Sequence, residues 1–195
     1  MNLANKITIF RIILVPIMVI IPFFGIEGDF LGIPITYWII NFIFIIGSIT
    51  DKLDGYIARS KNQITNFGKF LDPIADKILV LAAMMMLVEL AKLPAWVPII
   101  VITREFVVSG YRLIAVEKGG KVIAASVWGK LKTVTQMIAV ILAFLDVNGF
   151  AAFMTIKLTG FSLILNIVST AIMFISVIAA IFSGWDYIKG RKRFI

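Results

Sequence analysis

Long apolar runs separated by short polar segments cover almost the whole 195-residue chain. A helix that crosses the hydrocarbon core of a bilayer needs roughly 20 mostly apolar residues. Six runs reach this length, and the last is long enough to tilt or to emerge from the bilayer. The pattern predicts spanning helices at about 7–25, 34–59, 68–91, 94–117, 127–146 and 155–188.

The composition indicates that lipid is the solvent of these helices. Hydrophobic residues make up 61% of the chain and the mean hydropathy is +1.02, whereas soluble domains are about 45–50% apolar. We therefore predict an all-α polytopic membrane protein with one domain over residues 1–195. The first run has a basic flank, as a signal peptide does, but it lacks a small-residue cleavage site, so we expect a retained helix.

Basic residues mark one set of helix ends and predict the orientation. In a membrane protein, a net charge of +8 reflects cytoplasmic Lys and Arg beside anionic lipid rather than nucleic-acid binding. Six spans put both termini on one side, which we expect to be the cytoplasmic side of the cell membrane. This set of ends holds Lys6, Arg11, Arg59, Lys61, Lys69, Lys118, Lys121, Lys130, Lys132, Lys189, Arg191, Lys192 and Arg193, and the opposite loops hold Lys92, Lys157, Glu27, Asp29 and Asp146.

The chain has no cysteine and no histidine. Disulfides, thiolate nucleophiles, imidazole bases and zinc sites built on these residues are therefore excluded. Acid–base chemistry falls to Asp, Glu, Lys or Tyr. Any metal must be held mainly by oxygen, which favours Mg²⁺, Mn²⁺ or Ca²⁺.

Four aspartates gather in one stretch, TDKLDGYIARSKNQITNFGKFLDPIADK, which runs from Thr50 to Lys77. They form two pairs, and on a helix the spacing within each pair puts both carboxylates on one face. The polar segment between the pairs predicts a turn that returns the second helix antiparallel to the first, so all four carboxylates can meet. The pairs are Asp51 with Asp54 and Asp72 with Asp76.

Four carboxylates in a low-dielectric place repel one another unless cations or protons neutralise them. Two divalent ions fit both the charge and the oxygen-only ligands, and such sites commonly clamp the attacking and leaving oxygens of a phosphoryl displacement. The alternative is a solvated hairpin at the membrane surface, with the acids paired to neighbouring Lys and Arg. Gly55, Ala58 and Gly68 leave space either for a bulky ligand or for close helix packing.

The stretch resembles the signature of the CDP-alcohol phosphotransferase family, D-x-x-D-G-x-x-A-R-x8-G-x3-D-x3-D, at every position and spacing. Members are six-helix membrane enzymes, usually homodimers, that use divalent metals to displace CMP from a CDP-linked lipid or alcohol with a hydroxyl acceptor. Four more stretches, NLANKITIFRIILVP, TREFVVSGYR, GKLKTVTQ and SGWDYIKG, resemble the branch that makes phosphatidylglycerophosphate. This resemblance implies CDP-diacylglycerol and glycerol 3-phosphate as substrates, two Mg²⁺ or Mn²⁺ ions, and a homodimer.

The resemblance also implies unequal roles for the signature residues. Asp51, Asp54 and Asp72 would be metal ligands. Asp76 would be the base that removes the proton of the acceptor hydroxyl, and it can also touch one metal. Asn5 and Thr8, near the first span, would help to hold the CDP lipid or would instead cap the first helix. The residues expected to border the CDP lipid are Asn5, Thr8, Asp54, Gly55, Ala58, Arg59 and Gly68.

Cations for the phosphate of the acceptor lie outside the signature. Arg104 and Arg112 are eight residues apart, so one face of the fourth helix can carry both, and a buried arginine suits bidentate phosphate binding. Arg104 could instead pair with Glu105 or with a motif aspartate. The alternative for the lysine candidates is positive-inside bias, and for the C-terminal arginine it is contact with anionic lipid. The acceptor-phosphate candidates are Arg104, Arg112, Lys130, Lys132 and Arg191.

Other functions stay open on the sequence alone. The acceptor could be serine, inositol phosphate or phosphatidylglycerol, although the arginines of the fourth helix favour an anionic acceptor over serine. Membrane prenyltransferases also use aspartate-rich motifs with Mg²⁺, but they usually have more helices and lack the G-x-x-A-R continuation. An ion or proton transporter would spread its carboxylates near the midplane over several spans of related halves, whereas here the carboxylates cluster at one end.

Overall fold

The computed structural model describes residues 3–60, 66–117 and 127–189. Within these ranges, only the backbone is described at residues 3–4, 51–60, 66–70, 72–73, 76, 113, 115–117 and 188. The described residues form α1 (Leu3–Ile20), η1 (Ile21–Phe24), β1 (Asp29–Phe30), β2 (Ile33–Pro34), α2 (Ile35–Ser60), α3 (Asn66–Glu89), α4 (Trp96–Glu117), α5 (Val127–Leu145), η2 (Ala152–Met154) and α6 (Gly160–Lys189).

The predicted helices occur in the predicted order, with different ends in the first and last runs. The first run divides, because α1 continues through Pro16 but a separate 3-10 helix with a proline in its first turn follows it. The last run begins later than predicted. Its first residues, 155–159, form a connection that follows η2, and α6 starts only at Gly160, whose φ of +60° turns the chain into the helix.

Three helical segments among the described residues are long and apolar enough to cross a membrane. They are Asn5–Phe24, Val127–Leu145 and Gly160–Tyr187, with mean hydropathies of 2.5, 1.3 and 2.4. Large apolar side chains such as Phe161 and Ile164 on α6 are 76% and 60% exposed, as suits helices that face lipid. The described part of the chain is therefore an all-α membrane protein with one small β-hairpin, whose two strands have two residues each.

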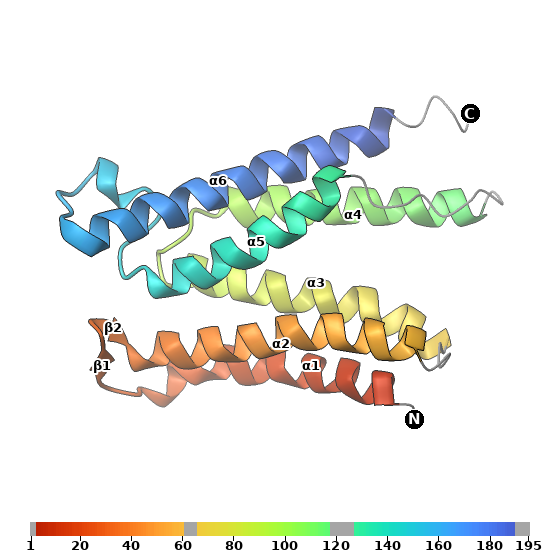
Figure 1. Cartoon of the computed structure of the whole chain (residues 1–195), viewed down its shortest axis with the longest axis horizontal. Helices are drawn as coiled ribbons and strands as arrows, with labels where there is room; N and C mark the ends of the chain where they lie inside the picture. Colours follow the sequence, from red (N-terminus) through yellow and green to blue (C-terminus); the bar gives the residue numbers. More distant parts are fainter. Residues whose placement is uncertain (1–2, 61–65, 118–126, 190–195) are drawn as a thin grey trace.

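The helices lie in two neighbouring groups (Figure 1). One group is α1–α3, in which α1 packs against α2 and α3, and the other is α4–α6, in which α6 packs against α4 and α5. Contacts of α2 with α5, and of α3 with α4 and α5, join the groups. The start of α1, the end of α2, the start of α3 and the end of α6 share one end of the bundle, here called the motif end. The β1–β2 hairpin and the α5–α6 connection lie at the other, here called the hairpin end.

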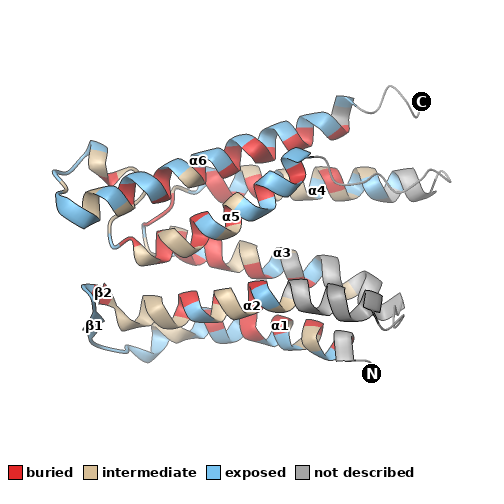
Figure 2. Cartoon of the chain, viewed as in Figure 1, coloured by how far each residue is buried: buried red, intermediate tan, exposed pale blue. Residues whose placement is uncertain are grey.

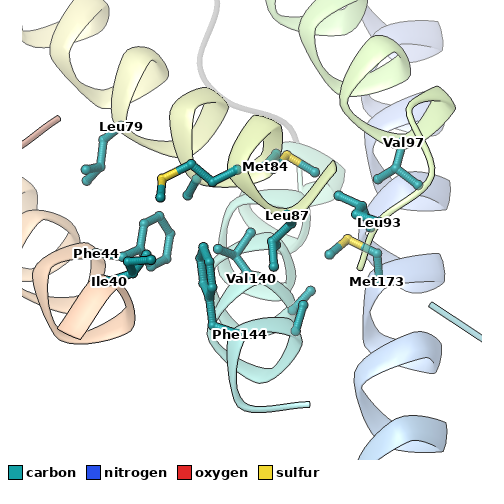
Figure 3. Close-up of a cluster of buried hydrophobic side chains, with 14 of the residues drawn as sticks. Ile40, Phe44, Leu79, Met84, Leu87, Leu93, Val97, Val140, Phe144 and Met173 are labelled. Carbon is teal, nitrogen blue, oxygen red and sulfur yellow. The ribbon is translucent and has the colours of Figure 1, made fainter. Parts of the chain in front are cut away.

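Buried apolar side chains fill the space where the two groups meet (Figures 2 and 3). Because lipid tails are as apolar as these side chains, close packing rather than transfer from water holds such helices together. Gly47 on α2 shows how close the packing is, since a Cβ atom there would lie 2.6 Å from Cδ2 of Leu79 on α3. The core residues labelled in Figure 3 are Ile40, Phe44, Leu79, Met84, Leu87, Leu93, Val97, Val140, Phe144 and Met173.

A buried lysine closes the hairpin end. Lys92, in the connection between α3 and α4, is only 5% exposed. Its ammonium donates to the carbonyls of Phe144 at 3.2 Å and Asp146 at 2.6 Å, and it lies 3.8 Å from the centroid of the Tyr37 ring. Burial lowers the pKa of Lys92 to about 8, against the opposing attraction of the Asp146 carboxylate. The lysine thereby ties the α3–α4 connection to α2 and to the end of α5.

The carboxylate of Asp146 organises the α5–α6 connection from within. This side chain is 2% exposed. Its Oδ1 accepts hydrogen bonds from the backbone N–H and side-chain amide of Asn148, at 3.0 and 3.3 Å. Its Oδ2 accepts from the amide of Asn166 at 2.7 Å and the hydroxyl of Ser169 at 3.0 Å, both on α6. Both carboxylate oxygens are thus satisfied, as burial of a charge requires.

Candidate functional site

The helical backbone carries the aspartate signature to the motif end. Helix α2 stays helical through Asp51 and Asp54, and α3 is already helical at Asp72 and Asp76. Each pair is therefore spaced by about one helical turn, on two helices that are consecutive in the chain. For the signature residues the structure describes only the backbone, and it does not describe Arg191 at all. The signature residues concerned are Asp51, Asp54, Gly55, Ala58, Arg59, Gly68, Asp72 and Asp76.

Close contact between α2 and α3 continues to the edge of the signature. Gly47 comes one turn before Asp51, and its neighbour Leu79 comes three residues after Asp76. The backbones therefore approach each other next to the aspartates. This arrangement fits a ligand site built from both helices, and the carboxylate donor set fits Mg²⁺ or Mn²⁺.

A charged cluster, the Glu105 cluster, joins α4, α5 and α6 and consists of Arg104, Glu105, Lys132 and the nearby Lys77. Glu105 Oε1 accepts from Arg104 Nη1 at 3.0 Å and from the ammonium of Lys132. The side chains of Arg104 and Lys132 are only 12% and 8% exposed. Nη2 of Arg104 donates to the hydroxyl of Ser183 on α6. The alternative pairing of Arg104 with Glu105 is thus confirmed.

Lys77 connects this cluster to the aspartate signature. It directly follows Asp76 on α3, and its ammonium donates to the hydroxyl of Ser109 on α4. Ser109 lies one turn after Glu105, and Lys77 is within electrostatic range of that carboxylate. The residue that follows the last signature aspartate therefore lies at the Glu105 cluster, across the α3–α4 contact.

The other acceptor candidates occupy different surroundings. Arg112 is exposed; its Nη2 donates to the hydroxyl of Tyr187 on α6 at 2.7 Å, and its guanidinium carbon lies 5.5 Å from the ring centroid. Lys130 is exposed on α5. The structure therefore brings Arg104 and Lys132 together and leaves Arg112 and Lys130 near the surface.

The candidate residues of α1 lie on its buried face. Asn5 and Thr8 are 6% and 1% exposed, and Arg11, one turn further, is fully buried. Helix α1 begins by Leu3, so Asn5 and Thr8 lie inside the helix and do not cap it. The inner face of this apolar helix therefore carries three polar side chains, and one of them, Arg11, is charged. Such residues within a membrane helix are costly and usually functional.

Sequence reasoning missed several contacts in this region. It named Glu105 only as a possible partner of Arg104 and missed its contact with Lys132, although an acid inside an apolar run usually has a role. Ser183 and Tyr187 carried no signal, since hydroxyl groups on a long apolar helix are common and only the packing of α6 against α4 selects them. Arg11 was counted as a flanking charge, whereas it is buried.

The fold and the site together define an α-helical membrane protein with an acidic motif and buried cations toward one end of its bundle. The family model for CDP-alcohol phosphatidyltransferase matches residues 1–185. The chain therefore belongs to this family, as the sequence signature predicts.

Several curated relatives match over nearly their full length. A CDP-diacylglycerol–glycerol-3-phosphate 3-phosphatidyltransferase of Bacillus subtilis (strain 168) is 43% identical over 191 residues, covering 95% of this chain and 93% of that protein. A probable phosphatidylglycerophosphate synthase of Mycobacterium tuberculosis (strain H37Rv) is 35% identical, covering 98% of this chain and 82% of that protein. A CDP-diacylglycerol–glycerol-3-phosphate 3-phosphatidyltransferase of Rickettsia bellii (strain RML369-C) is 34% identical, covering 99% and 97%.

Proposed function

We propose that this chain is a phosphatidyltransferase that moves the phosphatidyl group of CDP-diacylglycerol to glycerol 3-phosphate, giving phosphatidylglycerophosphate and CMP. The observation that carries the proposal is the largely buried pair of cations, Arg104 and Lys132, beside a family signature of four aspartates. The names of the relatives support the same acceptor. We take residues 1–195 as one catalytic membrane domain.

The reaction needs a base and a way to stabilise a leaving diphosphate. The acceptor hydroxyl oxygen attacks the phosphorus that carries the diacylglycerol, a new P–O bond forms, and the bond from that phosphorus to the CMP oxygen breaks. Asp76 takes the proton of the hydroxyl. Asp51, Asp54 and Asp72, with Asp76, would hold two Mg²⁺ or Mn²⁺ ions. Bound ions would offset the charge of the diphosphate.

The CDP lipid would lie between α1, α2 and the start of α3. Asn5 and Thr8 offer buried polar groups on α1. Gly55, Ala58 and Gly68, with Arg59 and Asp54, would border the nucleotide from the other two helices, because small residues allow a flat group to approach a helix backbone. The acyl chains would then remain in the bilayer beside the bundle.

The phosphate of the acceptor would bind at the Glu105 cluster. Nε of Arg104 is buried and has no hydrogen-bond partner among the described residues. Such a donor is costly unless a ligand satisfies it, and an arginine recognises phosphate through several N–H groups at once. Arg112, Lys130 and Arg191 would attract the anionic substrate from the aqueous side.

We further propose six membrane spans, both termini and the motif end in the cytoplasm, and a homodimer in the cell membrane. The distribution of Lys and Arg along the chain supports this orientation. The shared position of the start of α1 and the end of α6 in Figure 1 supports the even number of spans. Family resemblance supports the homodimer.

An acceptor panel tests the function. The purified protein in detergent is incubated with CDP-diacylglycerol, Mg²⁺ or Mn²⁺, and glycerol 3-phosphate, serine, inositol phosphate or phosphatidylglycerol, and CMP release is measured. We expect release with glycerol 3-phosphate, little with the others, and none after EDTA until Mg²⁺ or Mn²⁺ is restored. CMP release driven mainly by another acceptor would overturn the assignment, and EDTA-resistant release would overturn the metal site.

A further inference from the structure

We propose that Glu105 is a positioning residue that holds Arg104 and Lys132 together so that both can bind the phosphate of the acceptor. The two cations come from different helices, α4 and α5. The inference rests on the proposed function, because it assigns a role to a residue beside the proposed acceptor site. Glu105 itself would contact the two cations and not the reacting atoms.

The geometry of Glu105 is that of a bridge. A single oxygen, Oε1, accepts from both Arg104 Nη1 and the Lys132 ammonium, which draws the two cations to one point. The guanidinium is fixed on its other side by the hydroxyl of Ser183. Its stem lies against Gly184, where a Cβ atom would be 3.5 Å from Arg104 Cγ. With two of its nitrogens held, the guanidinium presents its remaining Nε in a fixed direction.

The charges of the cluster match a phosphate monoester. Three cations, Lys77, Arg104 and Lys132, surround one acid, Glu105. These side chains carry an excess of two positive charges, and a phosphate monoester carries about −1.5 to −2 at pH 7. Without the acid, three like charges would share a largely buried space, which is unfavourable. Glu105 therefore both brings the cations together and limits their repulsion before the acceptor arrives.

This role predicts a specific kinetic change in Glu105→Gln. The neutral amide keeps the size of the side chain but loses the charge that attracts both cations. Hydrogen bonds to charged groups are strong enough that losing this arrangement should raise the KM for glycerol 3-phosphate about 10-fold or more. The KM for CDP-diacylglycerol should stay within about two-fold, because that substrate is bound through other helices.

The experiment measures both KM values for the wild type, Glu105→Gln, Glu105→Asp and the control Glu89→Gln, which neutralises an exposed acid near the end of α3. We expect Glu105→Asp to fall between wild type and Glu105→Gln, since it restores the charge on a shorter stem. Glu89→Gln should match the wild type. If Glu105→Gln does not fold, Glu105→Asp alone decides, with a selective rise in KM for glycerol 3-phosphate expected.

Different results separate the two proposals. A wild type that does not turn over glycerol 3-phosphate would overturn the proposed function. If the wild type is active, an unchanged KM for glycerol 3-phosphate in the folded Glu105 variants would overturn the positioning role alone. Equal rises in both KM values would also overturn it, because they would show a general loss of structure.

Discussion

The carboxylate of Asp146 should be the most sensitive single group at the hairpin end. In Asp146→Asn, an amide replaces a buried carboxylate that accepts four hydrogen bonds, two on each oxygen. An asparagine offers only one oxygen. In either orientation of the amide, its NH₂ group therefore faces two donors, either those of Asn148 or those of Asn166 and Ser169. The buried ammonium of Lys92 also loses a nearby negative charge.

The size of the effect follows from these contacts. Each hydrogen bond to a charged group contributes about 1.5–3 kcal/mol, and at least two such bonds are lost. Contributions within one network are not additive, so we expect a loss of about 3–5 kcal/mol, the usual cost of breaking a buried charge arrangement. For a chain of this size, each kcal/mol lowers Tm by about 2–4 °C, so Tm should fall by on the order of 10 °C.

Thermal unfolding in detergent, followed by the fluorescence of the four tryptophans, measures the change. The matched control is Asp29→Asn, which makes the same substitution at an exposed position of the β1–β2 hairpin at the same end of the bundle. The control should melt with the wild type. A Tm for Asp146→Asn within about 2 °C of the control would refute the structural role assigned to this carboxylate.

Three further changes give separate predictions. Asp76→Asn should lower kcat at least about 10²-fold, since the base is lost. Binding of CDP-diacylglycerol, measured by ligand-induced thermal stabilisation, should persist. Wild-type turnover in this variant would contradict the assignment of the base. The pKa of Lys92 is lowered to about 8 from 10.5, so between these values the unfolded state binds more protons and stability rises with pH. Between these two pH values, the Tm of the wild type should therefore rise relative to the Tm of Lys92→Met. Parallel curves of Tm against pH for the two proteins would contradict the lowered pKa of Lys92. Gly47→Leu should separate α2 from α3, because even a Cβ atom there would meet Leu79 at 2.6 Å. CMP release should fall much more in this variant than in Gly47→Ala, where the tip of Leu79 can shift. Equal activities of the two variants would show that this close contact does not position the aspartates.

The number and order of the helices could be predicted because apolar length is a property of each segment alone. The ends of the first and last runs could not. In the last run, residues 155–159 (TIKLT) mix apolar and polar side chains, and the left-handed backbone of Gly160 marks where α6 begins. In the first run, α1 ends two residues before Pro22, although the apolar pattern continues through η1. Local backbone conformation thus sets limits that hydropathy does not report.

The site was predictable to a different degree in each of its parts. The aspartate signature is a local pattern, so one stretch of sequence was enough to find it. The Glu105 cluster depends on contacts among four helices, and sequence could propose Arg104 and Lys132 but could not distinguish the buried Lys132 from the exposed Lys130. That distinction depends on the rotation of α5 relative to α4, which tertiary packing determines.

The burial of Lys92 also bears on how the chain enters the membrane. Membrane insertion acts on the nascent chain, before Tyr37 and the carbonyls of Phe144 and Asp146 surround the ammonium. In the proposed orientation, this lysine must cross to the outer side, which the positive-inside bias disfavours. The finished fold then uses the same side chain, as a hydrogen-bond donor to two carbonyls, to close the hairpin end. Biogenesis and native packing thus place opposite demands on one residue.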